Sequence, residues 1–272
     1  DVTSKFDWQG SETYRNDLSV VFRPVPEVTF RGKAYLDLDK MHSFLRYDSW
    51  DPNTFLPYRA DNHNAYHSTV TGQEIMARWS IVPSYTASAG ADFRQEKLDV
   101  RQVEINHDTK AGVTRNEWDP MVHKSGVWTR HEWQAMEHLR LIASLRYDWH
   151  SQFGDHWTAA GGTVIDAAKG TRIRFYGGTS YRAPTMNDMF WPQGGNKNLE
   201  PEEGWSFESS VEQRLFEDRL AIHAGYFYWN VRDKIQWAPD SSGMFWTPQN
   251  VNEQLCHGVE IETKARPADS LE

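Results

Sequence analysis

The chain has 272 residues, a formal net charge of -9, 39% hydrophobic residues and 14% aromatic residues. This acidic balance argues against a phosphate-backbone partner, which needs a basic face, so no nucleic acid partner is expected. The single cysteine, Cys256, excludes an intrachain disulfide and a cysteine-based metal site. No run of about 18 apolar residues is present, so a helical membrane protein is excluded as well.

The hydrophobic pattern along the chain has a period of two residues rather than 3.6. In the segment 139–150, odd positions are apolar or aromatic and nearly all even positions are polar, which is typical of a strand with one apolar face. The same pattern recurs along the chain and predicts about eleven strands in a single domain that covers residues 1–272. The strands are expected near 12–23, 27–47, 69–81, 86–98, 123–136, 139–150, 158–167, 171–183, 204–215, 220–237 and 252–265.

The connections between these segments alternate between short and long. Compact turns are expected at 23–26, 82–85, 137–138, 167–170 and 216–219. Long polar connections are expected at 48–68, 99–122, 151–157, 184–203 and 238–251. This alternation is typical of an outer-membrane barrel, which has short periplasmic turns and long extracellular loops. The expected fold class is therefore all-β: an antiparallel transmembrane β-barrel segment in contact with outer-membrane lipid.

The alternation also predicts which side chains face lipid, because neighbouring residues of a strand point to opposite faces. Side chains of the segment 139–150 that are expected to face lipid are Leu139, Leu141, Ala143 and Leu145. Those expected to face the lumen are Arg140, Ser144 and Arg146. Glu208, Glu212, Glu260 and Glu262 are expected on the lumen side of later strands.

Several motifs follow one another in the C-terminal half of the chain. Tyr-Arg-Ala-Pro at 181–184 ends one strand, and Gly-Asn-Lys-Asn-Leu-Glu-Pro-Glu at 195–202 opens the next. The segments 227–235 and 250–260 continue the order. This order resembles the barrel of TonB-dependent receptors, and the segment 187–196 resembles the cobalamin-receptor-like members of that family.

The resemblance implies a receptor in the outer membrane of a Gram-negative bacterium. Such a receptor takes up a scarce small nutrient, cobalamin or an iron–siderophore complex, with energy supplied by the TonB complex. In this family the TonB complex acts through a plug domain, and nothing in the sequence resembles the plug. Since large transporters of this kind close with about 22 strands, the chain is expected to form about half of a barrel. Enzymatic activity is not expected, because no nucleophile-elbow, phosphate-loop or His-Glu-x-x-His motif is present.

Candidate ligand-binding residues lie in or beside the expected extracellular loops. They are Arg182, Trp191, Asn196, Phe245 and Trp246. The aromatic members could stack on a nutrient. An alternative role for Arg182, together with Glu202, is to organise the loop rather than to touch the ligand.

The stretch 48–68 also contains candidate metal ligands. Asp48, Asp51 and Asp61 supply the oxygen ligands that calcium prefers, and His63 and His67 are the type of side chain that binds transition metals. A solvated polar loop would contain the same residues. No other cofactor is expected.

Two other functions remain open at this point. A passive porin of about a dozen strands would need a last strand that pairs with the first. A secreted glycan-binding β-protein would use the 13 tryptophans as sugar platforms, but a soluble sandwich has shorter strands and no alternation of loop length.

Overall fold

The computed structural model describes residues 8–50, 54, 56–191, 194–240, 243 and 246–266. Its strands are β1 (Trp8–Val25), β2 (Val28–Trp50), β3 (Pro57–Val82), β4 (Tyr85–Asn106), β5 (Gly112–Trp118), β6 (Met121–Met136), β7 (Leu139–His150), β8 (Gly154–Ala168), β9 (Thr171–Arg182), β10 (Glu202–Leu215), β11 (Leu220–Pro239) and β12 (Trp246–Ala265). One short helix, α1, covers Met186–Phe190. No helix in the described residues is long and apolar enough to cross a membrane.

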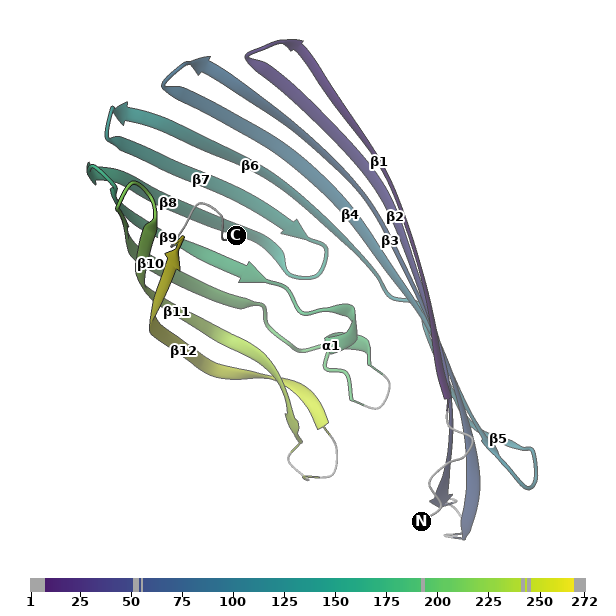
Figure 1. The fold of residues 1–272 in the computed structure, drawn as a ribbon. Helices are drawn as coiled ribbons and strands as arrows, with labels where there is room; N and C mark the ends of the chain where they lie inside the picture. Colours follow the sequence, from purple (N-terminus) through teal and green to yellow (C-terminus); the bar gives the residue numbers. More distant parts are fainter. Residues whose placement is uncertain are drawn as a thin grey trace.

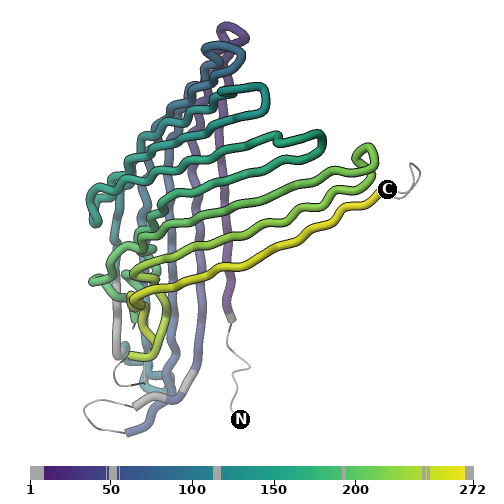
Figure 2. The backbone as a smooth tube through the Cα atoms, turned by 90° about the vertical axis from the view of Figure 1, so that its left-hand side faces the viewer, coloured from purple at the N-terminus to yellow at the C-terminus, as the bar shows by residue number. Residues whose placement is uncertain are grey.

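All twelve strands belong to one antiparallel sheet. Each strand pairs with the next along the chain, except that β4 pairs with β6 along the main path and with β5 beside it. Figure 1 shows the sheet as a curved wall with α1 on its concave side. Figure 2 shows the strand direction turning steadily from β1 to β12, as the twist of neighbouring strands requires. The predicted all-β fold is confirmed.

Four of the expected long loops are shorter than the sequence pattern indicates. They are 48–68, 99–122, 151–157 and 238–251, parts of which belong to β2, β3, β4, β5, β6, β8, β11 and β12. Strand pairing continues there, for example between Asp61 of β3 and Ile105 of β4. Both faces of these strand ends carry polar residues. The alternation of apolar and polar residues therefore ends there, although the hydrogen bonds between the strands continue. For the same reason the sequence pattern misses β5.

The register sorts the side chains of the sheet onto two faces. Trp191, which follows α1 on the concave side, stacks on Tyr66 of β3 with ring centroids 5.5 Å apart. Tyr66 pairs with Val100 of β4, so alternate residues of β4 as far as Asp92 share the concave face. Asp92 binds Arg146 of β7 at 2.8 Å. The even residues of β7 therefore lie on the concave face and the odd ones on the convex face, in agreement with the predicted sorting.

The two faces differ in chemistry. The convex face exposes large apolar side chains, among them Leu18, Phe22, Phe30, Val127, Leu145, Phe175, Phe207, Val259 and Ile261. The concave face carries ion pairs between neighbouring strands, such as Lys124 with Glu96 and Arg174 with Glu212, each at 2.8 Å. An apolar outer surface around a polar interior is the arrangement of a membrane barrel.

Candidate functional site

The described part of the connection between β9 and β10, residues 183–191 and 194–201, lies on the concave side of the sheet (Figure 1). It contains α1, which begins with a capping box: Thr185 Oγ1 accepts from the Asp188 amide, and the Asp188 carboxylate accepts from the Thr185 amide. Trp237 Nε1 of β11 donates to the same carboxylate at 3.3 Å. The Asp188 residue is only 6% exposed, so the helix is tied to β11 through a buried group.

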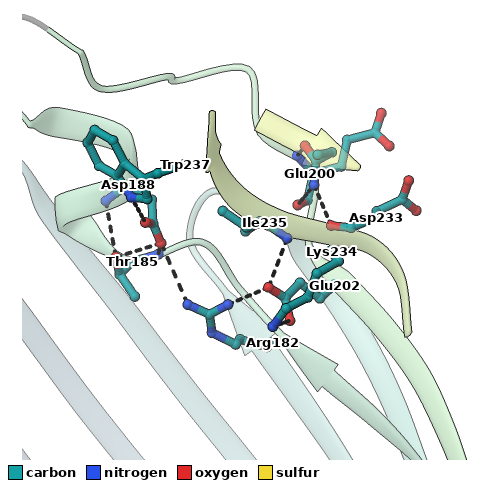
Figure 3. A network of polar contacts seen from close by, with 10 residues as sticks. Arg182, Thr185, Asp188, Glu200, Glu202, Asp233, Lys234, Ile235 and Trp237 are labelled. Atoms are coloured by element: carbon teal, nitrogen blue, oxygen red, sulfur yellow. Dashed lines mark hydrogen bonds and ion pairs between the residues drawn. The ribbon is translucent and has the colours of Figure 1, made fainter. Parts of the chain in front are cut away.

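A second buried carboxylate lies at the end of this loop, where β10 begins. Glu202, the first residue of β10, accepts hydrogen bonds from Arg182 and from the Ile235 amide, the latter at 3.0 Å, and Lys234 Nζ lies 3.4 Å away. Figure 3 shows the Arg182 guanidinium between Glu202 and Asp188. Its Nη2 atom lies 3.7 Å from the Asp188 carboxylate. Arg182 therefore links the carboxylate within α1 to the carboxylate at the start of β10. These contacts favour the loop-organising role of Arg182.

Two asparagines hold the second half of the loop against β12. Asn196 Nδ2 donates to the Pro248 carbonyl oxygen at 3.1 Å. Asn250 Oδ1 accepts from the Glu200 amide at 2.8 Å, and its Nδ2 donates to the Glu200 carbonyl oxygen at 2.9 Å. Because an asparagine amide offers both donors and an acceptor, one side chain satisfies both backbone groups of Glu200. The loop is thus fixed at both of its ends.

The turn after α1 requires two glycines because the backbone approaches its neighbours closely. A Cβ on Gly195 would lie 2.6 Å from the Met189 carbonyl oxygen and 2.6 Å from the Trp191 amide nitrogen. A Cβ on Gly194 would lie 2.7 Å from the Trp246 carbonyl oxygen. Any side chain at either position would push Trp191 or β12 away.

A cavity of about 470 Å³ opens beside this turn. Its lining residues are Trp118, Met189, Phe190, Trp191, Gly194, Gly195, Lys197, Asp240 and Thr247. Trp191 is 38% exposed although it stacks on Tyr66, so part of its ring remains accessible. Lys197 Nζ lies 5.3 Å from the centroid of the Phe190 ring. Aromatic faces beside a cation can stack a planar group and bind an anionic one.

The predicted ligand-binding residues have different positions around this cavity. Trp191 lines it, whereas Arg182 and Asn196 make the structural contacts described above. Trp246 begins β12 and is 63% exposed, and Phe245 lies outside the described residues. Their binding roles remain predictions. The sequence alone could not identify Tyr66, which reaches the site through the curvature of the sheet.

The calcium candidates lie only partly within the described structure, where Asp48 of β2 and Asp61 of β3 are diagonal neighbours across the strand pair. Arg46 Nε binds the Asp61 carboxylate at 2.6 Å, and His107 Nδ1 lies 2.8 Å from it. Asp48 is exposed on β2, and Asp51 lies outside the described residues. Within the described ranges, no group of three or more His, Cys, Asp or Glu side chains is arranged to hold a metal ion.

Sequence comparison relates the chain to a family of barrels. A model of the TonB dependent receptor-like beta-barrel matches residues 2–270. The vitamin B12 transporter BtuB of Vibrio vulnificus (strain YJ016) is 35% identical over 185 residues, 68% of this chain and 28% of that protein. BtuB of Photobacterium profundum is 30% identical over 145 residues, 52% of this chain and 22% of that protein. The chain thus spans less than a third of the length of these relatives.

Solved structures show the same fold at low sequence identity. The RagAB peptide importer superimposes with a TM-score of 0.69 and 18% identity, over 96% of this chain and 35% of that chain. The copper transporter OprC has a TM-score of 0.64 and 15% identity, over 95% of this chain and 51% of that chain. The ferric enterobactin receptor PfeA of Pseudomonas aeruginosa has a TM-score of 0.61 and 16% identity, over 96% of this chain and 50% of that chain. The chain belongs to the TonB-dependent receptor family of the Gram-negative outer membrane, whose members are receptors and transporters rather than enzymes.

Proposed function

We propose that this chain forms the wall and a ligand-facing loop of an outer-membrane receptor for energy-coupled uptake of cobalamin. The observation that carries the proposal is the β9–β10 connection, which is fixed on the concave side and presents Trp191 beside a cavity. The identity of the nutrient rests on the sequence relatives, which are vitamin B12 transporters at 30–35% identity. The siderophore receptor and the copper transporter share only 15–16% identity and support the fold alone.

The chemistry of the cavity suits this ligand. Cobalamin presents a broad, nearly planar macrocycle edged with amides and carries a phosphate. The accessible part of Trp191 offers an aromatic surface, and Lys197 offers a cation. Stacking and charge pairing at one position would orient such a ligand as it enters the lumen.

Energy coupling is proposed to act through a plug domain that engages the TonB complex. The concave face is suited to contact such a domain because its polar side chains already have partners within the sheet, as Arg146 has with Asp92 and Asp148. A surface of satisfied ion pairs can hold a soluble domain without burying unpaired charge. The plug could then move without breaking the wall.

Truncation of the aromatic platform tests the ligand site. In the full-length receptor, Trp191→Ala is expected to weaken cyanocobalamin binding at least about tenfold, because a central aromatic contact in a binding site typically contributes about 2 kcal/mol. The dissociation constant would be measured by calorimetry on detergent-solubilised protein. Trp157→Ala is the matched control, since Trp157 is 64% exposed on the convex face and its loss should leave affinity unchanged.

Two results would contradict different parts of the proposal. Unchanged affinity in Trp191→Ala would remove this loop from the ligand site. Binding of a ferric siderophore by the unmodified receptor, without binding of cyanocobalamin, would refute the nutrient but leave the family and the fold in place.

A further inference from the structure

Two histidines from neighbouring strands meet on the convex face, which is the opposite face of the sheet from the loop site. His42 Nε2 of β2 lies 3.5 Å from His67 Nε2 of β3, with ring centroids 5.3 Å apart and the rings inclined by 71°. In the register, His42 pairs with Ala65 and His67 pairs with Lys40. The two histidines are therefore diagonal neighbours on one face, a position from which long side chains interact.

The two histidines lie on the extracellular side of the band of apolar side chains that covers the convex face. The convex face of β2 is apolar at Leu36 and Leu38 and becomes polar at Lys40. From Val28, at the periplasmic end of β2, to His42 the strand rises about 46 Å, or about 33 Å along the barrel axis at a tilt of 45°. The apolar band of such barrels is only about 25 Å tall. His42, which is exposed, is therefore accessible from the extracellular medium.

The distance between the two nitrogens fits a metal ion better than a hydrogen bond. A good hydrogen bond from a ring N–H has a donor–acceptor distance near 2.9–3.0 Å, well short of the 3.5 Å observed. Two imidazole nitrogens at about 2.0–2.1 Å from a tetrahedral Zn²⁺ ion are about 3.4 Å apart. In a square-planar site, adjacent nitrogens would be only about 2.9 Å apart. The geometry therefore favours a tetrahedral ion.

The surroundings leave room for further ligands. The histidines line a cavity of about 690 Å³ together with Ala65, Asp99, Val100, Arg101, Trp118 and Asp119. Asp99 pairs directly with His67 across β3 and β4, and Lys97 holds its carboxylate at 3.0 Å. Asp99 and Asp119 bring negative charge to the cavity and Arg101 brings positive charge, so cation binding there would depend on the imidazole nitrogens rather than on net charge. We propose that His42 and His67 bind a Zn²⁺ ion in tetrahedral geometry, with water in the remaining positions.

The test is a titration of the full-length receptor with ZnCl₂ alone. Calorimetry is expected to show one saturable site, and Co²⁺ in its place is expected to give the intense visible absorption of a tetrahedral complex. His42→Ala and His67→Ala should each abolish that site and the cobalt absorption. His123→Ala is the matched control, because His123 is also on the convex face but stacks on Phe93.

Retention of the site in both His42→Ala and His67→Ala would overturn the proposal. Equal loss in His123→Ala would overturn it as well, since binding would then not depend on this pair. The far-ultraviolet circular dichroism spectrum of each variant reports whether the barrel is folded, so the zinc result can be judged whether or not the nutrient proposal holds.

Discussion

An arginine in place of Leu145 is expected to lower the free energy of unfolding of the full-length receptor in lipid by about 2–4 kcal/mol. Leu145 is 46% exposed on the convex face, so the charge would have to enter the hydrocarbon. It lies between two rows that contain aromatic residues, since Leu141 pairs with Trp133 nearer the periplasmic turn and Tyr147 pairs with Trp157 on the other side. Aromatic residues mark the interfaces of a barrel, which places Leu145 near the middle of the band.

The neighbouring residue provides the matched control. Ser144 points to the concave face, where a new arginine can remain hydrated, so Ser144→Arg should cost much less than Leu145→Arg. Reversible unfolding of both variants in lipid vesicles gives the comparison. Equal costs would mean that the two faces of β7 have the same surroundings, which would contradict the membrane position of this sheet.

Removal of the Glu202 carboxylate is expected to lower the free energy of unfolding about as much as Leu145→Arg does. Glu202→Ala should lower the free energy of unfolding by about 2–4 kcal/mol, because it leaves the buried Ile235 amide without its acceptor and removes the shared partner of Arg182 and Lys234. The loss should not exceed this range, because the Arg182 side chain is 47% exposed and water can hydrate it once the carboxylate is gone. Chemical denaturation in detergent would measure the loss.

A conservative variant separates charge from hydrogen bonding at this position. Glu202→Gln retains an oxygen that can accept from the Ile235 amide, so it should cost less than Glu202→Ala. If alanine at this position left stability and cyanocobalamin binding unchanged, the network in Figure 3 would not hold the loop.

The strands and their faces could be predicted where lipid imposes a chemical difference between the two sides. In β7, one face must be apolar along most of the strand, so the alternation from Leu139 to Trp149 is visible in the residues themselves. No such constraint acts on the outer ends of β2, β3 and β4. Their hydrogen-bonded ladders continue through polar residues, and the sequence pattern therefore indicates loops there.

The site could be predicted only in part, because its contacts join segments that are far apart in the chain. The motif residues Arg182 and Asn196 mark the loop, but their contacts depend on which strands the curved sheet brings beside it. The stacking of Trp191 on Tyr66 joins segments that are far apart in the chain, and no local pattern reports it. His67 shows the same effect: its ring meets His42 across the strand pair.

Uptake of labelled cyanocobalamin by intact cells would show whether the receptor carries out energy-coupled transport of cobalamin. The cells would produce the full-length receptor as their sole route for cobalamin across the outer membrane and would be compared with otherwise identical cells that lack functional TonB. Saturable uptake is expected in the first strain, and its loss is expected in the second. Uptake that persists without TonB, or no uptake by cells with a correctly inserted receptor, would contradict an energy-coupled cobalamin receptor.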